Sequence, residues 1–314
     1  MGLKATIASA LKDPRKAVSY GYGQFSQKVN RNIHNLYSRL LPTSNIFNED
    51  WDNLIILDGC RYDLLEPSDF PDRTINHRIS RGSHTVEFLR SNICNQFMDD
   101  IVWVSGNPQL TKFEEHLYKV VHVWKDSWDQ EHRTVMPEQM FSKALQVHDT
   151  YPNKRLVIHF IQPHYPFIGE NAKKKLENQS TFQFEEYGLG TDYEYDIWGA
   201  LERGEVEPEV VWQAYRENLE VALPFVRKLG KELQGKTIVS SDHGNAFGDW
   251  TFPVPLRIYG HPRGFFLESL RKVPWIVFDE GERKNIVASD QGDRTYNKPA
   301  KKVQERLQDL GYKN

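Results

Sequence analysis

The stretch Asn53-Leu54-Ile55-Ile56-Leu57-Asp58-Gly59 decides the fold. Four large apolar residues in a row run directly into a carboxylate and a glycine. A short apolar run that stops at such a turn is typical of a strand buried on both faces, as in a parallel sheet. The stretch therefore predicts an inner strand with Asp58 at its carboxyl end.

Other apolar runs of similar length follow along the chain, each bounded by polar or turn residues. They cover residues 101–104, 120–124, 156–161, 237–239 and 273–278. Helical patterns lie between them, and in the clearest, 208–234, apolar residues repeat at steps of three and four. This alternation predicts an α/β fold with a mainly parallel central sheet and helices on both faces. The acidic and aromatic segment 173–199 lacks clear periodicity, so we expect an excursion near the functional site.

The overall composition excludes some classes of protein. The formal net charge of the 314 residues is -3, so the chain lacks the basic field of a nucleic-acid binder and we expect no nucleic-acid partner. No apolar run approaches the length that spans a bilayer. Cys60 and Cys94 do not form a metal-binding or disulfide framework. The simplest interpretation is a cytoplasmic location with two free thiols.

The N-terminal segment differs from the rest in charge. Residues 1–40 hold seven lysines and arginines against the single acid Asp13, a local charge of 7 − 1 = +6. A helical period also joins five apolar residues there, namely Phe25, Val29, Ile33, Leu36 and Leu40. Two interpretations follow: a helix packed on the domain, or a peripheral contact with anionic lipid that makes the protein membrane-associated. We divide the chain into a basic helical segment, 1–45, and a catalytic domain, 46–314.

Three predicted strands end in side chains that bind metals. Asp58 follows the first, Gln162-Pro163-His164 follows the run 156–161, and Asp242-His243 follows the run 237–239. Ligands collect at the carboxyl ends of strands in open α/β sheets. Carboxylates and imidazoles suit zinc, manganese or another divalent ion. The sequence therefore predicts a metal site at this edge of the sheet.

These segments resemble a known family in the same order along the chain. Residues 56–63 and 240–245 resemble the two metal-binding motifs of the alkaline phosphatase superfamily. Residues 159–167 resemble the Pro-His-x-Pro-Phe segment of its sulfatase-like branch, and 303–312 resemble its closing helix. The resemblance covers roughly residues 50–312 and implies an alkaline phosphatase-like fold.

The resemblance also implies roles for individual residues. The superfamily places a Ser, Thr or modified Cys nucleophile at the start of a helix, and the matching stretch is 80–89. Thr85 is our first choice there and Ser83 the second, while capping of the helix is the other use of a threonine at that position. The implied metal ligands are Asp58, Thr85, Asp242 and His243. The implied phosphoryl- or sulfuryl-binding groups are His164, His261 and Arg61.

Departures from the family narrow the assignment. Neither cysteine lies in the Cys-x-Pro-Ser-Arg setting of formylglycine sulfatases, and Gly59 replaces the second of their paired aspartates. Phe160 stands where two-zinc phosphatases carry an Asp, which argues against a second metal. The pattern lies nearer the one-metal branch that uses threonine, which includes lipoteichoic acid synthases and phosphoethanolamine transferases.

The resemblance thus implies a metal-dependent hydrolase or transferase that acts on phosphate or sulfate esters through Thr85. It implies one divalent ion, which could be Zn, Mn, Mg or Ca. The alternative is a non-catalytic member of the fold that binds a metal or an anion.

Overall fold

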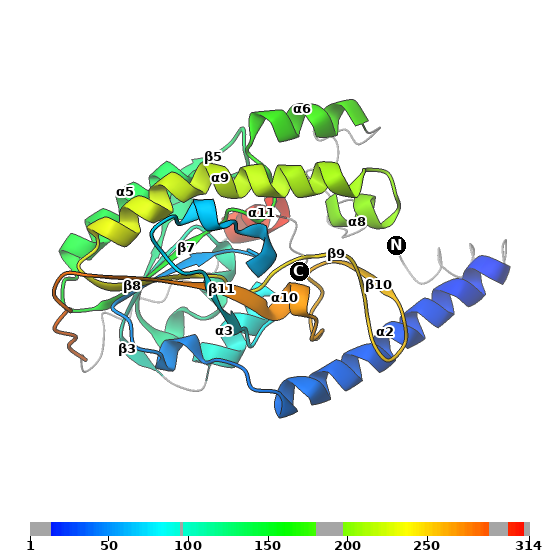
Figure 1. Ribbon diagram of the computed structural model, residues 1–314, viewed down its shortest axis with the longest axis horizontal. Coiled ribbons are helices and arrows are strands. Elements are labelled where there is room, and N and C mark those ends of the chain that lie inside the picture. Colours follow the sequence, from blue (N-terminus) through cyan, green and yellow to red (C-terminus); the bar gives the residue numbers. More distant parts are fainter. Residues whose placement is uncertain (1–13, 95–96, 180–196, 289–300, 311–314) are drawn as a thin grey trace.

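A seven-stranded sheet forms the centre of the molecule (Figure 1). The computed structural model describes residues 14–94, 97–179, 197–288 and 301–310. The strand order is β2-β11-β8-β1-β7-β3-β4, and the five strands from β8 to β4 are parallel. The strands are β1 (Asn53–Leu57), β2 (Asn76–Ile79), β3 (Met98–Ser105), β4 (Leu117–His122), β7 (Arg155–Phe160), β8 (Gly235–Ser240) and β11 (Lys272–Glu280). Only β11 runs against its neighbours, so the predicted mainly parallel sheet is confirmed.

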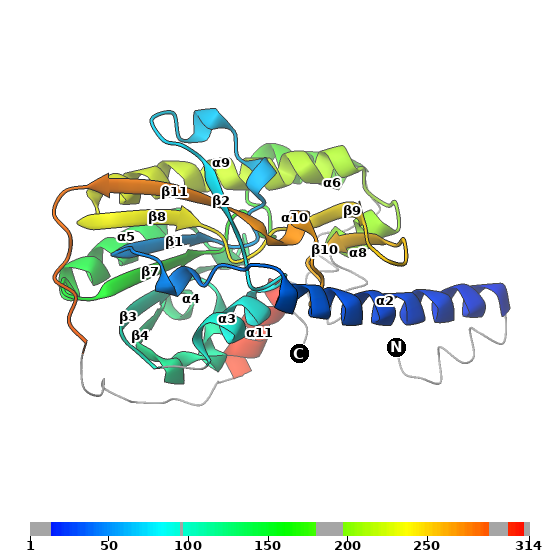
Figure 2. The ribbon, with the colours of Figure 1, turned by 60° about the horizontal axis from the view of Figure 1, so that its bottom comes forward.

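Helices cover both faces of this sheet. Besides the N-terminal helix, the described helices are α3 (Thr85–Ile93), α4 (Val123–Asp126), α5 (Pro137–Thr150), α6 (Glu170–Gln179), α8 (Ile197–Glu202), α9 (Pro208–Glu232), α10 (Glu268–Arg271) and α11 (Lys301–Asp309). In β1, Ile55 and Leu57 belong to the apolar cluster that includes α5 and α9. Leu54 and Ile56 belong to the cluster on the other face, which includes α3 (Figure 2). The prediction of helices on both faces is confirmed, because β1 is fully buried on each side.

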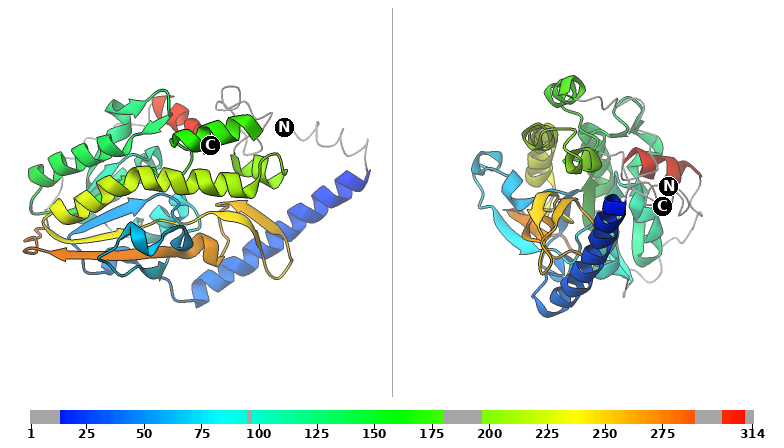
Figure 3. Two further views of the ribbon diagram at one scale, coloured as in Figure 1. Left: turned by 45° about the horizontal axis from the view of Figure 1, so that its top comes forward. Right: turned by 90° about the vertical axis from the view of Figure 1, so that its right-hand side faces the viewer.

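Two short hairpins and several turns complete the described residues. The hairpin of β9 (Ala246–Trp250) and β10 (Arg257–Gly260) lies between α9 and α2 (Pro14–Leu40) in the left view of Figure 3. The second hairpin pairs β5 (Trp128–Asp129) with β6 (Thr134–Val135). The 3-10 turns are η1 (Ile46–Asn48), η2 (Tyr62–Leu64), η3 (Pro67–Asp69), η4 (Pro108–Lys112) and η5 (Glu114–His116). Among the helices of the described ranges, none combines the length and the apolar character needed to cross a bilayer.

The prediction of a strand over residues 120–124 is only partly confirmed. β4 ends at His122, and the chain turns into the short helix α4 at Val123. Both Val123 and Trp124 are buried, so their apolar character serves packing rather than strand pairing. The closing helix is present as α11. The segment 173–199 contains the end of α6 and the start of α8, and its central part, 180–196, lies outside the described residues.

The N-terminal segment forms a long helix, as its apolar period predicted, and that helix packs on the domain. Its contacting face is polar rather than apolar. Asn30 Nδ2 donates to Thr251 Oγ1 at 2.7 Å, and His34 Nε2 lies 2.6 Å from the carbonyl oxygen of Phe252. The domain boundary at residue 45 stays a prediction, and residues 1–13 lie outside the described part of the chain.

Burial of β1 on both faces has a measurable consequence. We expect Ile55→Ala and Ile56→Ala each to lower the free energy of unfolding by about 2–5 kcal/mol, because each leaves a cavity in a different apolar layer. Urea denaturation of both variants tests this. Val287→Ala, at an exposed position, is the control and should change little. A sheet with one solvated face would show a loss for only one of the two isoleucines.

Candidate active site

The predicted site residues meet at one edge of the sheet. β8, β1 and β7 are neighbours, and their carboxyl ends carry Asp242 with His243, Asp58 and His164. Thr85 is the first residue of α3, which begins beside them. The side chains of Asp58, Thr85, Asp242 and His243 are fully buried. Residues separated by up to 185 positions in the sequence, from Asp58 to His243, therefore share one buried cluster.

Asp58 lies at the centre of the cluster. Its Oδ2 accepts from Asn107 Nδ2 at 2.5 Å and lies 3.3 Å from His159 Nε2. Its Oδ1 lies 3.5 Å from Thr85 Oγ1 and 3.6 Å from His243 Nε2. Burial alone would raise the pKa of Asp58. The adjacent rings of His159, His164 and His243 outweigh burial and hold the pKa below its ordinary value, so the carboxylate stays charged.

Asp242 Oδ2 and His243 Nε2 are acceptor atoms that lie on the same side of the site as Asp58. The backbone N–H groups of Gly59 and His243 donate to Asp242 Oδ1 at 3.0 and 2.9 Å. Among the described residues, no group hydrogen-bonds to the buried Asp242 Oδ2. His243 Nδ1 lies 2.9 Å from the carbonyl oxygen of Gly244, so a neutral ring donates there and presents its Nε2 lone pair. That Nε2 atom is 3.4 Å from Asp242 Oδ2 and 3.2 Å from Thr85 Oγ1.

These donor atoms fit a divalent metal ion. A buried carboxylate oxygen without a hydrogen-bond donor is costly unless a cation meets it. Asp58 and Asp242 supply two carboxylates, His243 an imidazole nitrogen and Thr85 a hydroxyl. This mixed oxygen and nitrogen set suits zinc or manganese.

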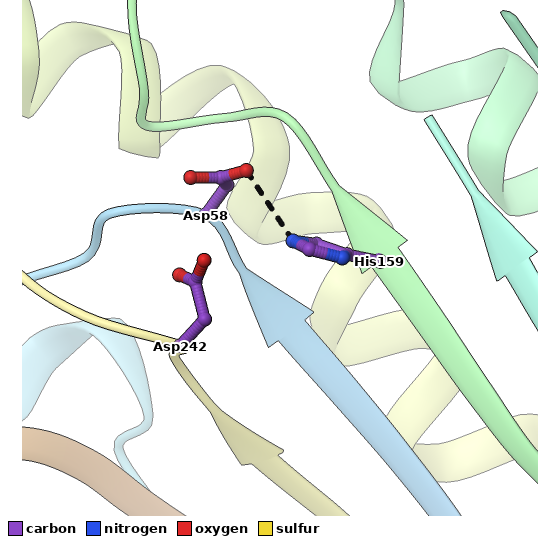
Figure 4. Close-up of side chains that lie close together, drawn as sticks. All are labelled: Asp58, His159 and Asp242. Atoms are coloured by element: carbon purple, nitrogen blue, oxygen red, sulfur yellow. Dashed lines mark ion pairs between the residues drawn. The ribbon is translucent and has the colours of Figure 1, made fainter. Parts of the chain in front are cut away.

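His159 belongs to the cluster, although the sequence analysis gave it no role. Asp58, His159 and Asp242 each offer a ligand atom, and these atoms lie within 4.8 Å of one another (Figure 4). His159 lies inside the buried strand β7, opposite Ile56 of β1. A histidine within an otherwise apolar strand was the signal that could have found it. Asn107, which follows β3 and donates to Asp58, carried no comparable signal.

His164 and His261 face each other across the site. Their Nε2 atoms are 3.4 Å apart. His164 Nδ1 lies 2.5 Å from the carbonyl oxygen of Tyr165, and His261 Nδ1 lies 2.8 Å from Asn245 Oδ1. Two neutral rings that donate through Nδ1 would present two lone pairs to each other, so this arrangement suits a hydrogen-bond donor or a cation between them. Burial lowers the pKa of both rings.

The start of α3 distinguishes Thr85 from its neighbours. His84 is the N-cap, because its Nδ1 accepts from the backbone N–H of Val86 at 3.1 Å. The interpretation of Thr85 as a helix cap is therefore wrong. The Ser83 hydroxyl has two acceptors for its one proton, Glu87 Oε2 at 2.8 Å and the carbonyl oxygen of Pro262 at 3.0 Å. Of the two candidate nucleophiles, Thr85 has the carboxylate and imidazole of the cluster beside it.

Arg61 is engaged with protein groups. Its guanidinium forms two hydrogen bonds with Asp63, at 2.6 and 2.7 Å, and donates to the carbonyl oxygen of Asn245 at 2.9 Å. It also lies over the ring of Trp212, 5.2 Å from the centroid. A contact between Arg61 and a substrate oxyanion stays a prediction.

The two departures from the family have structural reasons. Gly59 has a φ of +65°, and a Cβ built there would lie 2.9 Å from Asn245 Nδ2. Asn245 donates to the carbonyl oxygen of Gly59 at 3.0 Å and also holds His261. Asn245 thus occupies the space that a second aspartate side chain would need. Phe160 is buried in the apolar cluster beneath α5 and α9, where a charged ligand would be costly.

Comparison with known proteins finds likenesses of fold rather than of sequence. No protein-family model matches the sequence, and no curated protein matches it. The structure of the integral membrane lipooligosaccharide phosphoethanolamine transferase A from Neisseria meningitidis aligns with a TM-score of 0.50 at 10% identity, over 88% of this chain and 59% of that one. The chain therefore spans about three fifths of the length of that protein.

Two further solved structures align less well. The C-terminal periplasmic domain of EcEptC from Escherichia coli, in complex with zinc, gives a TM-score of 0.46 at 14% identity, over 76% of this chain and 75% of that one. A protein in the alkaline phosphatase superfamily from Vibrio parahaemolyticus gives 0.40 at 11% identity, over 86% and 68%. The likeness of fold rests here on the Neisseria transferase, at its TM-score of 0.50. It shows that this chain shares the fold of that transferase.

The loop that carries His164 depends on one buried amide. Asn218 of α9 donates through Nδ2 to the carbonyl oxygens of Pro163 and His164, and its Oδ1 accepts from the N–H of Ile168. We expect Asn218→Leu to lower the free energy of unfolding by about 2–4 kcal/mol, because it leaves these buried backbone groups unpaired. Gln213→Leu, at an exposed position of the same helix, is the matched control. Chemical denaturation measures both, and equal small losses would contradict this role for Asn218.

Proposed function

We propose that this chain is a metal-dependent phosphotransferase or ester hydrolase that uses Thr85 as its nucleophile. The observation that carries the proposal is the buried convergence of Thr85 Oγ1 with Asp58, Asp242 and His243 at the start of α3. A hydroxyl at a helix N-terminus beside metal ligands is the arrangement expected of an activated nucleophile. The fold of the Neisseria transferase supports the same class of chemistry.

Asp58, Asp242 and His243 would hold one divalent ion, with Thr85 as a further ligand. His159 is an additional candidate ligand, because its Nε2 lies 3.3 Å from Asp58 Oδ2. Such an ion, when bound, lowers the pKa of a coordinated hydroxyl and offsets negative charge on the transferring group. We propose one ion rather than two, because Phe160 and Asn245 occupy the places where ligands of a second ion would stand.

In the proposed reaction, Thr85 Oγ1 attacks the phosphorus of the ester. A bond forms between Oγ1 and phosphorus, and the bond from phosphorus to the leaving alcohol breaks. The Thr85 proton has an acceptor close by in Asp58 Oδ1 at 3.5 Å, since the lone pair of His243 Nε2, 3.2 Å away, is assigned to the ion. Water or an acceptor alcohol then attacks the phosphothreonine, and the bond to Oγ1 breaks. An acceptor alcohol makes the protein a transferase, and water makes it a hydrolase.

His164 and His261 are placed to bind the transferring group. A cation between their facing Nε2 atoms would meet the negative charge that spreads over the phosphoryl oxygens in the transition state. A protonated ring would donate to one of those oxygens. We extend the proposal to sulfate esters as an alternative substrate, since the sulfuryl group offers the same tetrahedral oxygens.

The proposed reaction does not specify the alcohol that leaves the phosphoryl group. The Neisseria transferase carries phosphoethanolamine in its name, so a phosphoethanolamine-bearing ester is the first substrate to test.

The predicted cytoplasmic location stays a prediction. Both cysteines are free in the structure, and burial raises the pKa of the Cys60 thiol, which makes it an unreactive packing residue.

Metal content tests the ligand assignment. We expect about one equivalent of divalent metal in the purified protein, and we expect Asp242→Ala and His243→Ala each to lower that occupancy at least about tenfold. Inductively coupled plasma mass spectrometry measures it after dialysis against a trace-metal buffer. His116→Ala, which changes a histidine outside the cluster, is the control. Unchanged metal content in both site variants would overturn the assignment.

Turnover tests the nucleophile. We expect Thr85→Ala to reduce hydrolysis of an aryl phosphate by at least about a thousandfold while the fold and most metal binding remain. Ser83→Ala should have a much milder effect, because Ser83 is bonded to Glu87 and Pro262. Mass spectrometry of the trapped intermediate should place the modification on the Thr85 peptide. Modification of Ser83 would show that the other hydroxyl reacts, and bound metal without any turnover would favour a non-catalytic anion-binding protein.

A further inference from the structure

The large apolar side chains that remain exposed gather in one region of the molecule. Seven of the nine such side chains among the described residues belong to α2, to the residue after it, or to the segment at the end of β9. They are Phe25, Leu36, Tyr37, Leu40, Leu41, Trp250 and Phe252. We call this set the α2 surface. Apolar side chains scattered singly need no explanation, but a cluster marks a site of interaction.

In α2 the polar side chains are buried and several apolar ones are exposed, the reverse of an ordinary surface helix. Ser26, Asn30 and His34 are at most 4% exposed, whereas Phe25 and Leu40 are 65% and 73% exposed. The polar side face binds the domain through Asn30 and His34. At about 100° per residue, the five residues of the apolar period fall within one stripe about 80° wide. The helix is therefore anchored by polar contacts while its apolar stripe is turned largely outward.

The charge of α2 has one sign. Residues 14–40 contain five lysines and arginines and no acid. Lys28 and Arg39 are exposed, and on the helical wheel they lie on the side of the apolar stripe away from the docked face. An apolar stripe with a basic flank is the pattern of a helix that lies in the interface of an anionic membrane.

The hairpin beside α2 extends the same surface. Phe252 contacts the ring of Tyr37, with centroids 6.2 Å apart, and Arg257 lies over the ring of Trp250 at 4.4 Å. Tryptophan and tyrosine side chains favour the headgroup level of a bilayer. α2 and the β9–β10 hairpin lie side by side beyond the carboxyl end of the sheet (Figures 1 and 2). Two elements far apart in the sequence thus form one continuous edge.

We propose that the α2 surface binds the surface of an anionic lipid bilayer. A second copy of the chain is a poorer occupant, because pairing two such helices would bring two basic flanks together. The bilayer supplies both an apolar layer for Leu36 and Leu40 and anionic headgroups for Lys28 and Arg39. This binding requires no turnover, so it stands or falls separately from the proposed reaction.

Co-sedimentation with vesicles tests the proposal. The full chain should bind vesicles that contain 30 mol% phosphatidylglycerol in phosphatidylcholine, and raising the salt from about 0.05 to 0.5 M should weaken binding at least about tenfold. Pure phosphatidylcholine vesicles should bind far less. No binding to the anionic vesicles at low salt overturns the proposal.

Matched variants assign the binding to this surface. Leu36→Glu combined with Leu40→Glu should lower the partition coefficient at least about tenfold, as should Lys28→Glu combined with Arg39→Glu. Val287→Glu and Lys231→Glu are the controls, since both positions are exposed and lie near the opposite edge of the sheet. All four proteins should keep the wild-type melting temperature and aryl phosphate turnover. Equal losses in the control proteins would show non-specific adsorption and overturn the assignment.

A fluorescent label separates the bilayer from other occupants. In a Cys94→Ser background, an environment-sensitive dye at Leu36→Cys should report water in buffer and shift to the blue when anionic vesicles are added. The same dye at Val287→Cys should not shift. A blue-shifted signal at Leu36→Cys in buffer alone would mean that a second copy, or another segment of this chain such as residues 1–13 or 180–196, covers the stripe. That result would overturn the proposal, and light scattering would tell which occupant is present.

Discussion

The buried carboxylate of Asp58 is the constraint on which the rest of the site depends. A charge without solvent must be met by nearby polar groups or by a cation. Asn107 and His159 meet one oxygen, and Thr85 and His243 lie beside the other. Each comes from a different element, so the sheet order that makes β8, β1 and β7 neighbours is also what makes this charge tolerable.

Asn245 ties the two halves of the site together. Its side chain donates to the carbonyl oxygen of Gly59 and accepts from the Nδ1–H of His261. The first contact fixes the turn after β1, and the second sets which nitrogen His261 presents to His164. A second aspartate at position 59 would have to displace this amide, so the same side chain both excludes that aspartate and orients the histidine pair. The left-handed φ of Gly59 is part of the same arrangement.

The sequence predicted the features that local pattern controls. Apolar runs located β1, β7 and β8, and polar residues after them located Asp58, Asp242 and His243. It could not find Asn107 or the tautomers of the histidines, because these depend on contacts between distant elements. For α2, periodicity identified the helix but did not tell which face would pack on the domain. Side-chain hydrogen bonds from Asn30 and His34 decided the orientation instead, and no periodicity reports them.

The position of Thr85 shows how one neighbour can change the role of a residue. A threonine before a helical run ordinarily caps the helix, and its hydroxyl then serves the backbone. Here His84 accepts the N–H of Val86, so capping does not require the Thr85 hydroxyl. Thr85 moves into the first turn, where the positive end of the helix dipole favours a developing alkoxide. The same imidazole lies 5.2 Å from the ring of His261, so the residue that caps α3 also packs against the pair that would bind the transferring group.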